Sequence, residues 1–167
     1  MKNLRILHLV HQYPPHFTGG TELYTQLLAA AQVLNGQQAM VFCPSPETKT
    51  GEMPAAEEEQ GVQVYRVPLG RRTRNRVFRD TFRQQKMLES LRILLQRDTP
   101  DIIHTQHLMG MPTGLIDLLV EEGLPYIVTL HDYWYVCANA QLLTNTDQTV
   151  CEGPERRYRN CSQCALV

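Results

Sequence analysis

The side chains and amides best suited to chemistry follow directly after three apolar runs of the sequence. The first run is followed, after two prolines, by Gly19, Gly20 and Glu22. Two glycines at the start of a helix let its N–H groups approach an anion closely, and the helix dipole adds to that attraction. A tight strand-to-helix turn without a ligand explains the two glycines equally well. The candidates after the other two runs are Gln106 and His107, and His131, Asp132 and Tyr133.

Two common phosphate-binding motifs are missing from the sequence. The first loop lacks G-x-G-x-x-G, and the second predicted strand ends in Cys43-Pro44-Ser45, without an acidic residue for a ribose. The sequence also lacks G-x-x-x-x-G-K-[ST], which excludes phosphate transfer from ATP through a P-loop. These absences disfavour a Rossmann-type oxidoreductase.

Four late cysteines follow the pattern C-x13-C-x9-C-x2-C. A C-x2-C pair binds one tetrahedral ion well, and two further thiolates could complete a structural zinc site. Free thiols, or disulfides formed during purification, are the alternatives. Cys43 lies in a predicted buried strand and is expected to belong to the core. The four late cysteines are Cys137, Cys151, Cys161 and Cys164.

Arginines gather between residues 71 and 83, where Phe78 and Phe82 lie one helical turn apart. A solvated helix face is the usual explanation of such a run. The alternative is docking to an anionic membrane surface or a phosphorylated lipid acceptor, with the phenylalanines inserted at the interface. Helical spacing places both phenylalanines away from a leucine stripe later in the predicted helix. The arginines are Arg71, Arg72, Arg74, Arg76, Arg79 and Arg83.

Apolar runs of strand length alternate with helical patterns over the first 130 residues, and these elements must position the candidates. Strands are predicted at 4–10, 39–43, 62–67, 101–105 and 126–130, and helices at 21–35, 76–96 and 111–122. This alternation predicts a Rossmann-like α/β fold with a doubly wound, mainly parallel sheet and flanking helices. Ligands bind at the carboxyl ends of such strands, where the candidates lie. A mobile acidic loop is expected at 45–61 and a cysteine-containing hairpin at 141–151.

The composition limits the classes of partner and compartment. The 167 residues include 16 basic and 17 acidic side chains, and the net charge of −1 gives no reason to expect nucleic acid as a partner. Arg5, His8 and His11 interrupt the first apolar run, so it does not predict a signal peptide. No window reaches the length and apolarity of a membrane span. We therefore expect a cytoplasmic protein. The arginines at 71–83 add the alternative of peripheral contact with the inner face of the membrane.

Three motifs, in this order, resemble family-4 glycosyltransferases of the GT-B fold. They are Tyr-Pro-Pro-x-x-x-Gly-Gly-x-Glu at 13–22, Asp-Ile-Ile-His-Thr-Gln-His at 101–107 and Pro-Tyr-Ile-Val-Thr-Leu-His-Asp-Tyr-Trp at 125–134. A sub-branch of that family also continues with Cys137, Gln141-Leu142-Leu143 and Cys151-Glu152-Gly153-Pro154 before a C-x2-C pair. The resemblance covers nearly the whole chain and departs from the family at Gly36-Gln37-Gln38, where Gly-His is usual.

The resemblance implies the N-terminal, acceptor-side domain of an enzyme that holds its active site between two Rossmann-like domains. It implies retaining hexosyl transfer from a nucleoside-diphosphate sugar to a glycan or lipid-linked acceptor, without a catalytic cofactor, in cell-envelope or polysaccharide synthesis. No donor-binding domain is recognisable in the sequence, and Ala165-Leu166-Val167 gives no helix-stop or turn signal. We therefore expect part of a longer protein, inactive on its own. Its Rossmann-like domain would span 1–136, and its cysteine-containing extension 137–167.

The resemblance also implies roles for the candidate residues. The amides of Gly19 and Gly20 would stabilise the donor diphosphate, and Glu22 would bind a sugar hydroxyl or complement the helix dipole. His131 matches the family histidine that lies against the donor sugar. Asp132 would orient His131, bind a sugar hydroxyl or only form a turn. The acceptor-side candidates are Gln106, His107 and Tyr133.

One alternative belongs to a different class of protein, a zinc-stapled α/β interaction module without catalytic activity. Such a module would use the four late cysteines as its staple and the rest of the chain as a binding surface.

Overall fold

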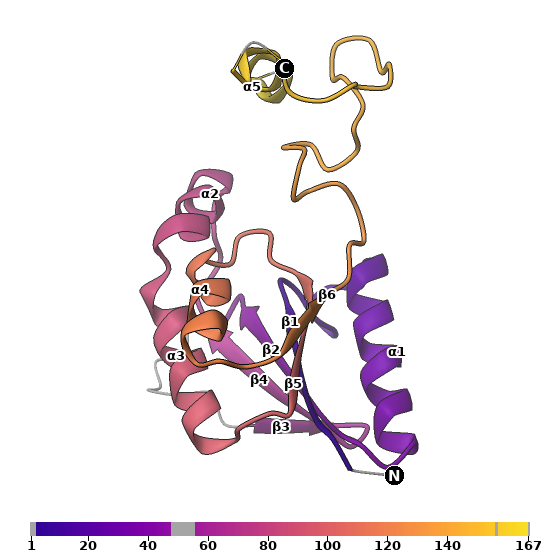
Figure 1. The fold of residues 1–167 in the computed structure, drawn as a ribbon, viewed down its shortest axis with the longest axis vertical. Helices are drawn as coiled ribbons and strands as arrows, with labels where there is room; N and C mark the ends of the chain where they lie inside the picture. Colours follow the sequence, from indigo (N-terminus) through magenta and orange to yellow (C-terminus); the bar gives the residue numbers. More distant parts are fainter. Residues whose placement is uncertain (1–2, 48–55, 156, 167) are drawn as a thin grey trace. The chain divides into compact units, whose positions relative to one another are not determined.

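A six-stranded sheet with the order β3-β4-β2-β1-β5-β6 organises the first part of the chain (Figure 1). The computed structural model describes residues 3–47, 56–155 and 157–166. Five of the strands run parallel to one another, as expected when both faces of a sheet are covered. This order confirms the predicted Rossmann-like, doubly wound α/β fold. The parallel strands are β1 (Arg5–Val10), β2 (Gln38–Ser45), β4 (Val62–Pro68), β5 (Ile102–His107) and β6 (Tyr126–Val128).

Helices cover both faces of the sheet (Figure 1). α1 (Gly20–Leu34) lies on one face, and α3 (Gln85–Arg97) and α4 (Gly114–Glu121) lie on the other. α3 buries Met87, Leu91 and Leu94, which recur at the spacing of one helical stripe. None of the helices in the described part of the chain has the length and hydropathy needed to cross a membrane.

The helix predicted at 76–96 is in fact two helices, α2 (Arg74–Arg83) and α3. Thr73 caps the start of α2, because its Oγ1 accepts a hydrogen bond from the N–H of Arg76 at 3.4 Å. The backbone leaves helical geometry at Gln84, where φ is −90° and ψ is 82°. No proline or glycine marks this break, so periodicity alone joins the two helices into one.

The acidic segment expected to be a loop includes a strand, β3 (Ala56–Glu59), which pairs antiparallel with β4. Residues 48–55 of the expected loop lie outside the described residues. The side chain of Arg66 on β4 is buried, and its guanidinium lies 2.7 Å from both the Glu57 and the Glu59 carboxylates. Alternate residues of a strand share a face, so one arginine can pair with both. The prediction of a loop here was wrong because glutamates disfavour strands, and the pairing with Arg66 that offsets this lies outside the acidic segment itself.

The chain divides into two compact units between Thr129 and Leu130, earlier than the predicted boundary after residue 136. The second unit contains an antiparallel bridge between Leu143 and Val150, which confirms the hairpin. It also contains α5 (Arg159–Leu166), a helix that the sequence did not predict. Each unit is described separately below.

Candidate functional site

A histidine at the end of β1 lies close to a carboxylate in the first turn of α1. His11 follows the last residue of β1, and its Nε2 lies 3.6 Å from Oε1 of Glu22 in the first turn of α1. Both side chains are more than nine-tenths buried. The other carboxylate oxygen of Glu22 lies beside Gly19, where an added Cβ would be only 2.5 Å from it. Glu22 is therefore fixed between His11 and the backbone of Gly19.

The N-terminus of α1 is open to solvent. Gly19 is its N-cap residue, no side chain caps the helix start, and both Gly19 and Gly20 are exposed. No other atoms would lie within 4 Å of a Cβ added at Gly20. An uncapped helix start attracts an anion through its N–H groups and its dipole. The structure thus places the two glycines as the diphosphate-binding hypothesis requires, and their ligand stays a prediction.

A second histidine lies against the first from the neighbouring strand. His107 is the last residue of β5, and its ring centroid lies 4.5 Å from that of His11. The Nδ1 of His107 accepts a hydrogen bond from the N–H of Met109 at 3.1 Å, and the side chain is 2% exposed. The structure therefore brings His107, His11 and Glu22 together in one buried cluster at the carboxyl edge of the sheet.

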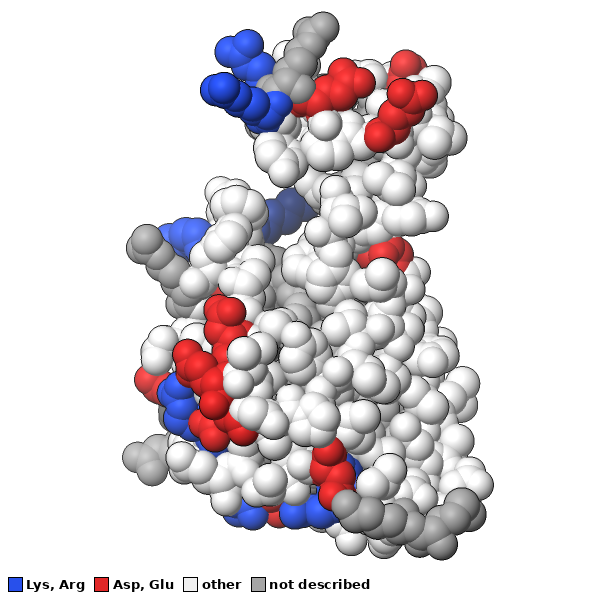
Figure 2. Space-filling view, viewed as in Figure 1, with Lys and Arg blue, Asp and Glu red and all other residues white. Residues whose placement is uncertain are grey.

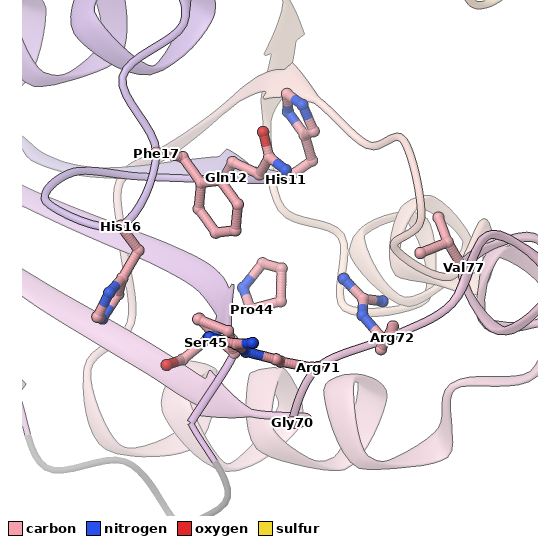
Figure 3. A pocket seen from close by; sticks show the side chains of 11 residues that line it. His11, Gln12, His16, Phe17, Pro44, Ser45, Gly70, Arg71, Arg72 and Val77 are labelled. Carbon is pink, nitrogen blue, oxygen red and sulfur yellow. The ribbon is translucent and has the colours of Figure 1, made fainter.

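A cavity of about 510 Å³ opens at the same edge (Figure 3). It is lined by residues at or just after the carboxyl ends of β1, β2 and β4 and by Val77 of α2, and Figure 3 shows Phe17 and Arg72 directed into it. Its volume lies within the range of small-ligand sites, and its combination of apolar wall and polar groups is typical of them. The lining residues are His11, Gln12, His16, Phe17, Pro44, Ser45, Pro46, Gly70, Arg71, Arg72 and Val77.

The charged groups at the cavity are mainly basic. Arg72 is anchored, because its Nη1 donates to Oδ2 of Asp80 at 3.1 Å and to the carbonyl of Gly110 at 2.8 Å. Arg71 is exposed, and no ion pair to it is found among the described residues. One carboxylate, that of Glu47, lies 3.8 Å from Nε2 of His16. The cavity can therefore bind hydroxyl or anionic groups through Arg71 and the polar loop side chains.

Gln106 lies in the interior of the sheet rather than at its surface. The side chain is fully buried, and its Nε2 lies 3.1 Å from Nδ1 of His8 on β1. The opposite ring nitrogen of His8 lies 2.8 Å from Oε1 of Gln32, so the ring donates from Nε2 and accepts at Nδ1. The structure thus places Gln106 in the interior of the sheet, and its contact with an acceptor stays a prediction. His104 is also buried, and its Nε2 lies 2.7 Å from Oγ1 of Thr129.

The other three candidates belong to the second unit. His131 is half-buried, and Asp132 and Tyr133 are exposed. The Oδ1 of Asp132 accepts a hydrogen bond from the N–H of Trp134 at 2.8 Å. This bond is typical of a turn-forming aspartate, which is one of the three roles expected for Asp132. Burial, with the Asp132 charge, raises the pKa of Tyr135. The sugar contacts of His131, Asp132 and Tyr133 stay predictions.

The four late cysteines line one small cavity of the second unit, about 70 Å³ in volume. All four are free thiols. Backbone N–H groups lie against these sulfurs: that of Asn145 donates to Cys164 Sγ at 3.2 Å, and that of Gly153 donates to Cys151 Sγ at 3.4 Å. Among the described residues, no three His, Cys, Asp or Glu side chains are placed to hold a metal ion. The sulfurs thus share a cavity without forming a ready-made zinc site, and structural zinc stays a prediction.

The sequence does not identify most of the residues that line the cavity. It does predict the position of the cavity, because ligands bind at the carboxyl ends of the strands in such sheets. His11 directly follows the first strand, and Ser45 ends the second, so both occupy positions where ligands bind in such sheets. In the sequence, Arg71 and Arg72 are recognisable only as part of a basic run. Phe17 carries no local signal, because its place in the cavity wall depends on how the loop folds.

Comparisons with known proteins bear on this arrangement. A family model described as "Glycosyl transferase 4-like domain" matches residues 19–160. A search of curated proteins found no match. Among solved structures, the chain is similar to sucrose-phosphate synthase from Thermosynechococcus elongatus, with a TM-score of 0.60 and 15% identity. The match covers 86% of this chain and 37% of that one, and at this identity it shows a shared fold.

Proposed function

The chain belongs to the glycosyl transferase 4-like family, and from this premise we propose that it forms the acceptor-side half of a nucleotide-sugar-dependent glycosyltransferase. The observation that carries the proposal is that His11 takes part in two features at the carboxyl edge of the sheet. His11 contacts Glu22 in the first turn of α1, and it also lines the 510 Å³ cavity. A diphosphate site and an acceptor site would therefore adjoin each other.

In this proposal, the start of α1 acts on the leaving group. The N–H groups at Gly19 and Gly20 supply fixed positive dipoles where negative charge grows on the departing diphosphate, so the transfer needs no catalytic metal. The Glu22 carboxylate, which lies 3.6 Å from Nε2 of His11, would accept a hydrogen bond from a sugar hydroxyl or complement the helix dipole. Retention at the sugar, with His131 and Asp132 beside the donor sugar, rests on the resemblance of the Leu-His-Asp-Tyr-Trp motif.

The acceptor would lie in the cavity. The amide of Gln12 and the guanidinium of Arg71 suit hydroxyl and anionic groups, and the ring of Phe17 offers an apolar surface to the face of a sugar ring. We propose a glycan or lipid-linked acceptor of cell-envelope or polysaccharide synthesis on the family resemblance. A nucleoside-diphosphate sugar would be the donor, bound mainly by a second domain.

A glycan-array experiment tests the acceptor assignment. The purified protein should bind a restricted set of oligosaccharides, and Gln12→Ala or Arg71→Gln should weaken that binding about tenfold or more, as expected when one well-placed polar contact is lost. Gln96→Ala and Arg92→Gln remove the same groups from exposed positions of α3 and should leave binding unchanged. Binding that both pairs of variants reduce equally would contradict an acceptor site in the cavity.

A turnover assay tests the assignment of this chain to one half of the enzyme. Residues 1–167 alone should not hydrolyse or transfer sugar from a panel of nucleotide sugars, because the donor-side contacts to the transition state would be missing. Measurable turnover by this chain alone would contradict the half-enzyme proposal.

A further inference from the structure

The helix α2 has one face packed on the protein. Val77 contacts Gly110, since a Cβ added at that glycine would lie 2.6 Å from Cγ1 of Val77. The carbonyl of Thr81 accepts a hydrogen bond from the N–H of Thr113 at 2.9 Å, and Asp80 is buried against Arg72. Residues 77, 80 and 81 therefore face the loop that precedes α4.

The opposite face of α2 presents two phenylalanines to solvent. Phe78 is 68% exposed and Phe82 is 61% exposed, although they are large apolar side chains. Their ring centroids lie 5.4 Å apart in an edge-to-face arrangement, so they form one apolar ridge. Residues four apart lie on one face of a helix, which places the ridge along the helix axis.

Basic side chains flank this ridge. Arg74, Arg76 and Arg79 are exposed, and Figure 2 shows basic side chains over this helix. At about 100° per residue, Arg74 falls on one side of the phenylalanines and Arg79 and Arg76 fall on the other. Asp80 is the single acidic residue in the sequence of α2, and it is buried and paired with Arg72. The exposed face of α2 is therefore basic around an apolar centre.

We propose that this face, formed by Arg74, Arg76, Phe78, Arg79 and Phe82, docks onto an anionic lipid bilayer. An apolar ridge bordered by arginines matches the boundary between acyl chains and anionic headgroups, where a helix lies parallel to the membrane plane. A single-stranded nucleic acid could also pair with the arginines and stack its bases on the two rings, but the net charge of −1 gives no whole-molecule reason to expect such a partner. The charge and the apolar ridge together favour the bilayer.

Docking would also set the position of the cavity. Arg72 and Val77 line the cavity, and Phe78, the next residue of the same helix, belongs to the docking face. The cavity would then open close to the membrane surface, where an acceptor anchored in the bilayer carries its glycan. This last step rests on the proposed function, whereas the docking surface itself does not.

Vesicle co-sedimentation tests the docking surface without using sugar transfer. The purified protein should bind vesicles of phosphatidylcholine with phosphatidylglycerol, should not bind vesicles of phosphatidylcholine alone, and should lose binding as salt is added. The double variants Arg76→Gln with Arg79→Gln, and Phe78→Ser with Phe82→Ser, should each weaken binding about tenfold or more. Thermal unfolding of each variant should match that of the unsubstituted protein, because these side chains are exposed.

Matched controls remove the same groups elsewhere. Arg92→Gln with Arg159→Gln takes two exposed arginines from α3 and α5, and Leu27→Ser with Leu34→Ser takes two exposed apolar side chains from α1. Both controls should bind anionic vesicles as the unsubstituted protein does. Absence of vesicle binding, equal binding to neutral vesicles, equal loss in the controls, or binding displaced by nucleic acid would each overturn the proposal. None of these outcomes affects the glycan-array result, so the two proposals fail separately.

Discussion

The carboxylate of Glu22 occupies the space that any side chain at Gly19 would need. A Cβ at Gly19 would lie 2.5 Å from Oε2 of Glu22, far inside van der Waals contact. We predict that Gly19→Ala displaces this carboxylate from His11 and lowers the free energy of unfolding by about 1–2 kcal/mol, the range for loss of one buried polar contact. Urea unfolding monitored by circular dichroism measures the change.

The neighbouring glycine offers a matched control for this prediction. Nothing lies within 4 Å of a Cβ added at Gly20, so Gly20→Ala should be neutral or slightly stabilising. In a Glu22→Ala background, Gly19→Ala should also lose most of its effect, because the clash is with the Glu22 side chain. Additive effects of the two substitutions would show that Gly19 acts independently of Glu22.

His8 makes the stability of the sheet depend on pH. Burial lowers the pKa of His8, the hydrogen bond to Gln32 raises it, and the neighbouring His104 lowers it further. The net effect is a pKa of about 4 instead of 6.5. Between these pH values the unfolded chain binds a proton that the folded protein excludes. We predict that the free energy of unfolding falls as pH falls through this window, by about 3 kcal/mol in total from this residue.

Urea unfolding at several pH values between 7 and about 4 measures this dependence. His8→Asn should be less stable near pH 7, because the bonds to Gln32 and Gln106 are altered, but its stability should fall less steeply with acid. An equally steep fall in the variant would assign the pH dependence to other groups.

The parallel sheet could be predicted because its signals are local. The residues of β1 and β2 form near-continuous apolar runs, and such runs between helical patterns indicate buried parallel strands whatever lies around them. β3 could not be predicted in this way, because glutamate disfavours strands and its pairing depends on Arg66. Gly19 and Glu22 could be nominated from their place after the first strand. The wall of the cavity could not, since Phe17 and Arg71 reach it only through the folding of two separate loops.

Arg66 should be the residue on which β3 and the first loop depend most. Its buried guanidinium pairs with Glu57 and Glu59, donates to the carbonyl of Pro14 and lies 5.7 Å from the centre of the Tyr13 ring. We predict that Arg66→Ala lowers the free energy of unfolding by about 2 kcal/mol, within the range for hydrogen bonds of a charged group, because Arg66 is buried but Glu57 is 65% exposed and Glu59 is 28% exposed. It should also raise hydrogen exchange at the amides of β3. Arg92→Ala, at an exposed position of α3, should change neither measurement.

The zinc hypothesis has a direct test, because the four late cysteines line a single cavity. It predicts about one zinc per chain after purification without chelators. Serine at Cys137, Cys151, Cys161 or Cys164 should remove the zinc, whereas Cys43→Ser should retain it because Cys43 is a core residue of β2. Elemental analysis of the purified proteins gives the answer. Protein free of zinc, with all four thiols reduced, would contradict the hypothesis.

In metal-free protein, Cys137 should be the most reactive thiol. Burial opposes its ionisation, but the backbone N–H groups of Leu142, Asn139, Gln141 and Ala140 outweigh burial and lower the pKa of this thiol. Burial raises the pKa of the Cys43 thiol to about 12, so that residue stays protonated near neutrality. The thiolate is the form that attacks an alkylating reagent, so the two sites should differ strongly in rate.

A time course with iodoacetamide, followed by peptide mass spectrometry, measures these rates. Near pH 7, Cys137 should be labelled first among the five cysteines, and Cys43 should react only after the protein is unfolded. The comparison is with the other half-buried thiols, Cys151, Cys161 and Cys164. Labelling of all four at one rate would mean that the N–H groups do not stabilise the Cys137 thiolate.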